Sequence, residues 1–362
     1  MVFSFSSSAQ QLPYQASKVV TGFKVDWTTH QRHAMGSDNF QLTWADDGHQ
    51  YGIWGDGGGF AGTNSKYRVS FGVARIEGDY NNYKGYDRYG NKESSEYEAK
   101  MPGKSWGIIC VEGNLYAWIH PDKVGNWANW DNRHYESRLS LSEDKGASWQ
   151  PANWAFTPED DFMGGNILQY GKNYTGAIDN YVYHYMVQPN MFSDSTGKAT
   201  EFQIPGRIFL LRVPKSSMMK RESYEFFSGL NGEIPTWTKN VKDKKPVFFD
   251  KNGVGSPIGI SYNPGLKRYL LSTEHSKPHG GMIGIFTSTN PWGPWATVTY
   301  VPDEKWFGYD NPVAVPRNCF FWCFPTKWMS EDGRSATMVF TGGGNGKNND
   351  SFNTVRVNFL TH

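Results

Sequence analysis

Two aspartates bracket a short segment near the start of the chain. Asp38 precedes and Asp56 follows the stretch QLTWADDGHQYGIWG, residues 41–55. Its two apolar runs, with Asp-Asp-Gly between them, predict a β-hairpin, so the two carboxyl groups would stand at the open end of the hairpin. Two carboxyl groups across a pocket are what hydrolysis of a glycosidic bond requires, because one donates a proton and the other activates water or attacks the sugar. Each aspartate taken alone could equally cap a turn.

The hairpin pattern recurs along the chain and identifies the elements that would position these carboxyl groups. Turn residues separate apolar runs at 112–114, 263–265 and 331–333, and a unit with a longer turn spans residues 167–188. Each hairpin is followed by a third run of strand type, and often by a fourth. Five copies of a four-stranded antiparallel unit predict an all-β fold, a five-bladed β-propeller, with seven blades as the less favoured alternative.

The last unit has only three predicted strands. A strand over residues 18–27 would supply the missing outer strand and close the ring. We therefore expect residues 1–17 to form an N-terminal extension and residues 18–362 to form a single β-propeller domain. The stretch SEDKGASW, residues 142–149, fits the Asp-box turn of propeller blades and falls between the third and fourth strands of the second unit.

A propeller also predicts which side chains meet. The inner strand of each blade begins at one face of the ring and the second strand returns to that face, so the residues flanking each hairpin converge on one mouth of the central channel. The candidate catalytic residues are Asp38, Asp56, His120, Tyr185 and His275. The candidate substrate-binding residues are His33, Asn39, His134, Tyr183, Gln188, Arg207, Glu274 and Arg317.

Two other functions remain open at this point. A polysaccharide lyase removes a proton beside a uronate carboxylate with His or Tyr as base and acid, which His120, His134, Tyr183, Tyr185, Arg207 and His275 could supply. A non-catalytic glycan-binding propeller is the third reading, since this fold hosts many scaffolds. Tyr181, Tyr183 and Tyr185 alternate along one strand, and a stripe of this kind is more often part of a core.

Composition excludes several partners. The chain has 362 residues with 36 basic and 35 acidic side chains, a balance that does not suit a nucleic-acid backbone or an anionic membrane surface. No apolar stretch approaches the roughly 20 residues of a membrane-spanning helix. The 15 Trp, 20 Tyr and 23 Phe favour strands and also suit sugar binding. A polysaccharide or oligosaccharide is the expected partner, and the oligomeric state is left open.

Metal and compartment signals are weak. The Cys and His residues do not have the spacing of a zinc site, and we expect no catalytic metal and no required cofactor. A structural calcium ion in the channel is an option that no ligand motif supports. The N-terminal residues MVFSFSSSAQQ lack a signal-peptide pattern, which leaves a trimmed signal or an intracellular protein. A polysaccharide-cleaving enzyme is nevertheless expected to be secreted or periplasmic.

Four segments resemble a family of bacterial propeller domains: SDNFQLTWADDGHQYGIWGDGGGF, SYNPGLKRYLLSTEH, NPWGPW and TKWMSEDGRSATMVFTG. The family is similar to five-bladed propellers that include endo-D-arabinanases, and the resemblance runs from about residue 30 to about residue 360. It implies a carbohydrate-active enzyme in which Asp38 and Asp56 are the catalytic pair. A more distant resemblance, to β-propeller lyases that cut ulvan and rhamnose–glucuronate linkages, supports the lyase reading, although those lyases are usually seven-bladed.

Overall fold

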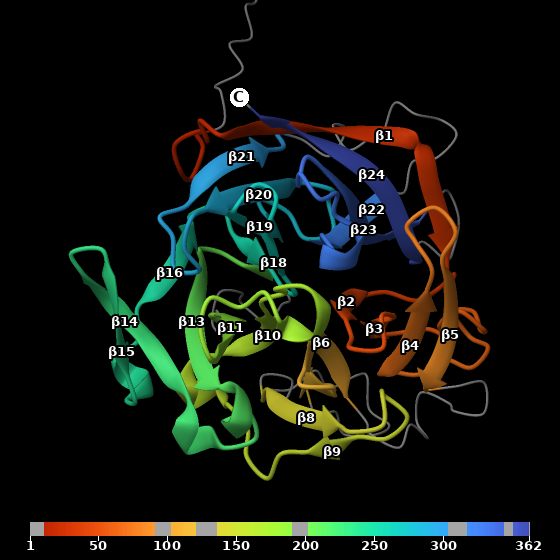
Figure 1. Cartoon of the computed structure of the whole chain (residues 1–362), viewed down its shortest axis with the longest axis horizontal. Helices are drawn as coiled ribbons and strands as arrows, with labels where there is room; N and C mark the ends of the chain where they lie inside the picture. The colour runs from red at the N-terminus through yellow and green to blue at the C-terminus, as the bar shows by residue number, and fades with distance from the viewer. Residues whose placement is uncertain are drawn as a thin grey trace, which may run out of the picture.

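The computed structural model describes residues 11–90, 103–120, 136–189, 202–302, 317–343 and 350–361. Within these ranges the regular structure is strands and short 3-10 helices, and no α-helix is present. Five antiparallel sheets stand around a common centre (Figure 1). The prediction of an all-β, five-bladed propeller is therefore confirmed. None of the helical segments among these residues has the length and apolarity needed to cross a bilayer.

The first two blades follow the predicted hairpins. Blade 1 has the strand order β2-β3-β4-β5 and blade 2 the order β6-β7-β8-β9, counted from the centre outward. The strands of blade 1 are β2 (Gln41–Trp44), β3 (Gln50–Trp54), β4 (Gly72–Glu77) and β5 (Lys84–Tyr89). Those of blade 2 are β6 (Lys104–Val111), β7 (Asn114–His120), β8 (Arg138–Ser142) and β9 (Gln150–Pro151).

Blades 4 and 5 complete the ring, and blade 5 takes its outer strand from the N-terminal part of the chain. Blade 4 consists of β18 (Gly259–Asn263), β19 (Arg268–Glu274), β20 (Ile283–Ser288) and β21 (Ala296–Tyr300). Blade 5 consists of β22 (Arg317–Cys323), β23 (Ser335–Gly343), β24 (Phe352–Thr361) and β1 (Val20–His33). Strand β1 pairs with β24 from Val20 opposite Thr361 to His33 opposite Phe352 (Figure 1). The predicted closure is confirmed, and the closing strand extends further than the sequence indicated.

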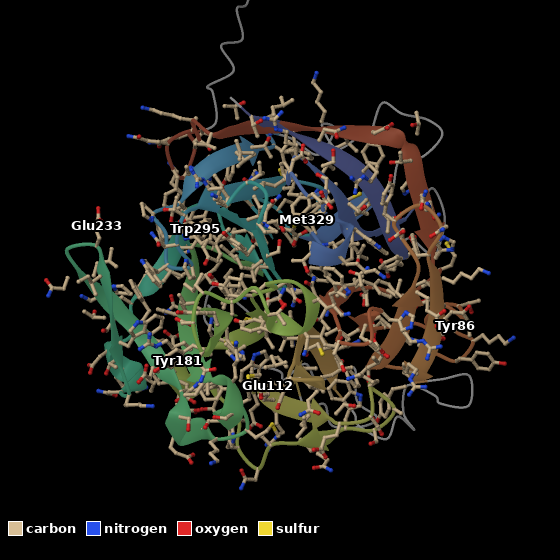
Figure 2. All side chains as sticks on the ribbon, in the orientation of Figure 1. Tyr86, Glu112, Tyr181, Glu233, Trp295 and Met329 are labelled. Atoms are coloured by element: carbon tan, nitrogen blue, oxygen red, sulfur yellow. The ribbon has the colours of Figure 1, made fainter. Side chains whose placement is uncertain are left out.

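Blade 3 departs from the four-stranded pattern. Its third strand pairs with β16 at one end and with β14 at the other, because the chain between them forms an additional hairpin. This hairpin projects from the ring, with Glu233 at its tip (Figures 1 and 2). The strands are β10 (Met163–Ile167), β11 (Tyr181–Val187), β13 (Gly206–Pro214), β14 (Glu225–Asn231), β15 (Ile234–Thr238) and β16 (Pro246–Asp250). A two-stranded sheet of β12 (Phe202–Gln203) and β17 (Val254–Gly255) joins blades 3 and 4.

Short 3-10 helices lie in the connections between strands. They are η2 (Pro158–Asp160), η3 (Lys172–Tyr174), η4 (Lys215–Ser217), η5 (Arg221–Ser223), η6 (Val241–Asp243) and η7 (Thr326–Trp328).

The apolar core lies between neighbouring blades. The largest cluster joins side chains of blades 2, 3 and 4, including Trp118, Tyr185 and Leu271, all fully buried. Three smaller clusters join the remaining neighbours. Large aromatic rings fill the wedge-shaped spaces between twisted sheets, which explains why so many are required. Most of the aromatic residues in the described ranges thus belong to the core.

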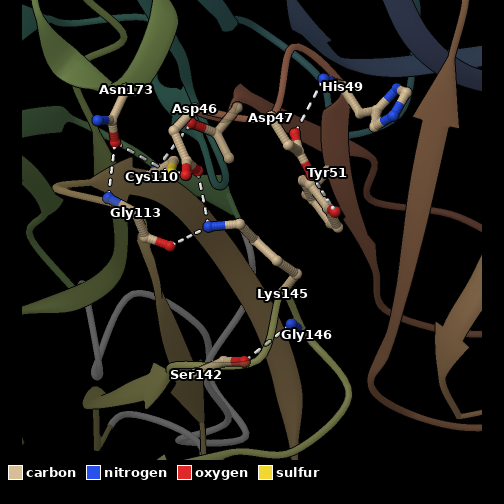
Figure 3. A network of polar contacts seen from close by, with 11 residues as sticks. Asp46, Asp47, His49, Tyr51, Cys110, Gly113, Ser142, Lys145, Gly146 and Asn173 are labelled. Atoms are coloured by element: carbon tan, nitrogen blue, oxygen red, sulfur yellow. Dashed lines mark hydrogen bonds and ion pairs between the residues drawn. The ribbon is translucent and has the colours of Figure 1, made fainter.

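Polar contacts join three blades at the turn end of the hairpins (Figure 3). Lys145 of blade 2 pairs with Asp46 of blade 1 at 2.6 Å and also donates to the Gly113 carbonyl. Asn173 of blade 3 accepts a hydrogen bond from the Gly113 amide at 2.8 Å. Lys145 belongs to the 142–149 turn, whose Asp144 carboxylate accepts bonds from neighbouring amides and hydroxyls. These contacts hold the blades together at the end opposite the hairpins' open ends.

Candidate active site

The open ends of the hairpins meet at one end of the ring, which we call the mouth. Strands β2, β6, β10, β18 and β22 are the innermost of their blades, and each begins at the end where the next strand finishes. Figure 1 shows these strands around the centre. The residues that flank the hairpins therefore lie at the mouth end of their blades.

Asp38 and Asp56 are direct neighbours across the first hairpin. The Asp38 amide donates to the Asp56 carbonyl at 3.3 Å, and the Gly55 amide donates to the Asp38 carbonyl at 3.0 Å. A Cβ at Gly55 would lie 3.2 Å from the Asp38 carboxylate. Glycine at position 55 thus leaves room for the Asp38 carboxyl group beside the second strand.

The Asp56 carboxylate contacts two cations. Its Oδ2 pairs with Arg68 Nη2 at 2.9 Å, and its Oδ1 pairs with Lys104 Nζ, which also donates to the Gly55 carbonyl at 3.1 Å. The Arg68, Lys104 and Asp56 side chains are 27%, 15% and 21% exposed. Since Lys104 begins β6, this ion pair joins blade 2 to blade 1. Both carboxylate oxygens are occupied by protein cations, which suits a positioning role for Asp56.

A third aspartate adjoins the pair. The Asp350 carbonyl accepts a hydrogen bond from the Gly36 amide at 2.7 Å, so the segment Gly36–Asp38 lies between Asp350 on one side and Asp56 on the other. Burial and the nearby Asp56 charge raise the pKa of the Asp350 carboxyl, while His279, Arg68 and Arg32 act in the opposite direction. A carboxyl group with a raised pKa is suited to carry a proton.

Blade 4 contributes a buried glutamate to the same end of the ring. Glu274 ends β19, is 2% exposed, and accepts a hydrogen bond from the His279 amide at 3.0 Å. A Cβ at Gly255 would collide with the Glu274 carboxylate, so glycine at 255 makes the space that this group occupies. The His279 ring stacks on Phe320 of blade 5, with centroids 4.0 Å apart. His279 therefore binds Glu274 through its backbone amide and also acts to lower the pKa of Asp350.

His275 faces away from the inner strands. Its imidazole stacks on Tyr300 of the outer strand β21, with centroids 3.6 Å apart, and its Nδ1 bonds to Ser276 Oγ at 2.9 Å. Burial lowers the pKa of His275 to about 3. The imidazole is therefore neutral across the physiological range and packed against the outside of its blade.

The tyrosines predicted to reach the mouth do not reach it. Tyr185 is fully buried, with its hydroxyl donating to the Pro291 carbonyl at 2.7 Å, and Tyr183 donates to Asp179 in the far-end turn at 2.7 Å. Burial raises the pKa of both hydroxyls. The placement predicted for these two residues is wrong, because alternate residues of β11 face the core rather than the strand end.

The remaining predicted residues occupy different surroundings. Asn39 joins three blades, because its amide donates to Thr341 Oγ1 at 2.9 Å and its side chain donates to the Ser105 carbonyl. His33 packs edge-on against Tyr83 at the outer edge of the ring. Gln188 and Arg207 form a hydrogen-bonded pair on blade 3. His134 and the side chains of His120 and Arg317 lie outside the described residues.

Several residues of the cluster were missed by the sequence analysis. Lys104 is the first residue of β6, the inner strand of blade 2, and Asp38 lies shortly before the inner strand of blade 1, so the rule that identified Asp38 could also have identified Lys104. Asp350 precedes the third strand of blade 5, and Arg68 lies in the segment before β4; neither position flanks a hairpin. No periodicity marks such residues, since only the folded ring brings them to Asp56.

Carboxamides fill the centre of the ring below the mouth. Asn166 donates to Gln41 Oε1 at 2.9 Å and to the Ile258 carbonyl, and Gln169 donates to the Ile108 carbonyl at 2.7 Å. Within the described ranges, no group of three or more His, Cys, Asp or Glu side chains could hold a metal ion. The structural calcium ion considered from the sequence stays an untested expectation.

Comparison with known proteins places the chain in a family. Residues 96–338 match the family described as "Domain of unknown function (DUF4185)", which covers more than half of the chain. The chain belongs to the DUF4185 family. No curated protein sequence matches this DUF4185 chain.

Solved structures share the fold of this DUF4185 propeller at low sequence identity. A candidate hydrolase of Bacteroides ovatus is 10% identical, with a TM-score of 0.56 over 90% of this chain and 87% of that one. The GH43_1 enzyme of Xanthomonas citri is 10% identical, with a TM-score of 0.51 over 92% of each chain. A β-xylosidase is 11% identical, with a TM-score of 0.50 over 92% and 95%. These similarities establish a common architecture.

Proposed function

We propose that this protein is a glycoside hydrolase that cleaves a polysaccharide or oligosaccharide at the mouth of the propeller. The observation that carries the proposal is the convergence of Asp38, Asp56 and Asp350, three carboxyl groups from separate segments, on one small region. Within it, one carboxylate is fixed by two cations and another has a raised pKa. Carboxyl groups in such contrasting environments are what acid and base roles require.

The roles are divided by environment. Asp38 is assigned as the carboxylate that acts at the sugar, since it stands beside Gly55 with its backbone fixed on both sides. Asp56, predicted from the sequence as the second catalytic group, positions Lys104 and Arg68 and helps to raise the pKa of Asp350. The proton donor belongs to the blade 4–5 side, where Glu274 is buried and Asp350 is half-buried. Asp350 is the assigned donor.

The shared fold supports this assignment at a general level. A GH43_1 enzyme and a β-xylosidase have the same propeller fold as this chain. A fold hosts many functions, so the argument rests on the carboxyl cluster and only secondarily on the fold. Action on a polysaccharide would also place the protein outside the cytoplasm, as a secreted or periplasmic enzyme.

A panel of neutral and uronate-bearing polysaccharides tests the reaction class. We expect new reducing ends without the ultraviolet absorbance of a new double bond. Absorbance would instead show β-elimination and support the lyase reading. Binding of a polysaccharide without either signal would support a glycan-binding propeller and contradict the proposal.

The acid and base assignments are tested with leaving groups of different quality. An aryl glycoside whose phenol leaves without protonation does not need the acid. The variant that lacks the donor should therefore retain much more activity on such a glycoside than on the natural linkage, whereas Asp38→Asn should lose both. Asp350→Asn and Glu274→Gln are compared directly; if only Glu274→Gln shows the leaving-group dependence, the donor is Glu274 and the assignment of Asp350 is wrong.

A further inference from the structure

Four side chains form a continuous row across the mouth end of blade 3. Gln188 Nε2 donates to Asp161 Oδ2 at 2.5 Å, and Gln188 Oε1 accepts from Arg207 Nη1 at 3.2 Å. The Arg207 guanidinium lies over the Phe249 ring, 5.2 Å from its centroid. Asp161 precedes β10, Gln188 follows β11, and Arg207 and Phe249 face each other on β13 and β16. The row therefore runs from the innermost strand of the blade to an outer one.

The charges along this row are unevenly compensated. Asp161 has a cationic partner in Lys244, whose Nζ lies 3.7 Å away and whose side chain is only 7% exposed. The Arg207 guanidinium contacts a carboxamide and an aromatic ring, and the described residues offer it no carboxylate. Arg207 is half-buried, so the residue keeps part of its surface in contact with solvent. Within the described ranges, Arg207 is thus a positive charge that forms no ion pair and is held by Gln188 and Phe249 at the mouth end of blade 3.

The outer end of the row is apolar. Phe249 is 42% exposed although it belongs to a strand, and its amide donates to the Tyr14 hydroxyl at 2.8 Å, which fixes the backbone beneath the ring. Most large aromatic side chains of this protein are instead buried between blades. An exposed ring beside a guanidinium matches the two features of an acidic sugar, an apolar ring face and an anionic group.

We propose that Asp161, Gln188, Arg207 and Phe249 form a subsite for an anionic sugar unit that carries a uronate carboxylate or a sulfate ester. Arg207 binds the anionic group and Phe249 packs against the sugar ring. Gln188 orients Arg207, and Asp161 holds Gln188. This inference deepens the proposed function by naming acidic polysaccharides as the substrate class, and it rests on that function only for the claim that the bound chain is cut.

Binding is measured on the full chain carrying Asp38→Asn, so that the probes are not consumed. Isothermal titration with tetragalacturonate, a sulfated carrageenan tetrasaccharide and xylotetraose separates the two anionic sources from a neutral chain. We expect at least one acidic probe to bind at least tenfold more tightly than xylotetraose. Arg207→Gln should remove that difference, Arg207→Lys should retain part of it, and Phe249→Ala should weaken the acidic probe several-fold.

Arg334→Gln, in the turn between β22 and β23 at the far end, is the matched control and should leave binding unchanged. Thermal melting of each variant excludes unfolding as the cause of a loss. The proposal is overturned if xylotetraose binds as tightly as the acidic probes, if neither acidic probe binds, or if Arg207→Gln leaves the affinity unchanged. An acidic probe that binds through Arg207 while the unsubstituted protein releases no reducing ends would refute the hydrolase function and leave this subsite standing.

Discussion

Lys104 and Asp56 form an ion pair that joins blade 2 to blade 1 at the mouth of the propeller. Lys104 also donates to the Gly55 carbonyl, so a single ammonium group fixes both the carboxylate and the backbone that ends the first hairpin. The Asp38 carboxyl group lies beside that same glycine. The geometry of the predicted catalytic hairpin therefore depends on a residue from the next blade.

Lys104→Met should reduce activity more than it reduces stability. The substitution leaves the partly buried Asp56 with Arg68 as its remaining cation, and we expect unfolding to become easier by about 1–2 kcal/mol. Activity should fall at least about tenfold, because the carboxylate and Gly55 are no longer fixed. Enzyme assay and urea unfolding of the same preparation measure both effects. Unchanged activity with reduced stability would show that the ion pair serves folding alone.

Asp350→Asn should lower activity without lowering stability at neutral pH. Burial and Asp56 raise the pKa of Asp350, so its ionised form is disfavoured in the folded protein, and stability is lost as pH rises through the folded pKa. The asparagine removes that cost. The variant should therefore be at least as stable as the unsubstituted protein at pH 7, and any advantage should disappear below about pH 4. Thermal melting across this range decides the matter, and a large loss of stability at pH 7 would contradict the assignment.

Asp144→Ala should destabilise blade 2 and have little effect on chemistry. Burial acts to raise the pKa of Asp144. Hydrogen bonds from Ser148, Ser142 and Ala147 outweigh this effect and lower the pKa. A lowered carboxyl pKa contributes stability above the unfolded value and loses it as pH falls through the folded one. Because Asp144 is exposed and solvent screens its charge, we expect a loss of only about 0.5–1 kcal/mol at pH 7. The exposed neighbour Glu143→Ala is the control, and equal melting temperatures for the two variants would contradict the prediction.

His184 and His275 should make the protein sensitive to acid. Burial lowers the pKa of each to about 3, whereas the unfolded imidazole titrates near 6.5, so the unfolded state takes up protons first as pH falls. Each histidine should cost about 1 kcal/mol for every pH unit below 6.5 until its folded pKa is approached. Urea unfolding between pH 7 and 5 measures this slope. His184→Gln should flatten it, and an identical slope in the variant would refute the explanation.

Local sequence patterns were sufficient for most of the architecture. Turn residues between apolar runs located the hairpins, and the missing outer strand of the last unit pointed to β1 beside β24. The additional hairpin β14–β15 was not predicted, because an insertion after β13 looks locally like another pair of blade strands. Blade identity is decided by which strands pair across the ring, and sequence separation does not encode this directly.

The candidate site was predictable only where residues flank a hairpin. Asp38, Asp56 and Glu274 satisfy that rule and lie at the mouth end. Asp350 does not satisfy it, since its place next to Asp56 follows from the Gly36 hydrogen bond between blades 5 and 1. The prediction that Tyr185 reaches the mouth was wrong for a different reason. Tyr185 lies two residues before the end of β11, and strand alternation turns its side chain into the core.

Release of reducing ends by the unsubstituted protein and by Asp38→Asn, on whichever polysaccharide the panel identifies, tests the central claim most directly. The account predicts steady release by the unsubstituted protein, a loss of at least about a thousandfold in Asp38→Asn, and the same melting temperature for both. Full activity in a folded Asp38→Asn variant would contradict it, because the carboxyl cluster at the mouth would then have no part in cleavage.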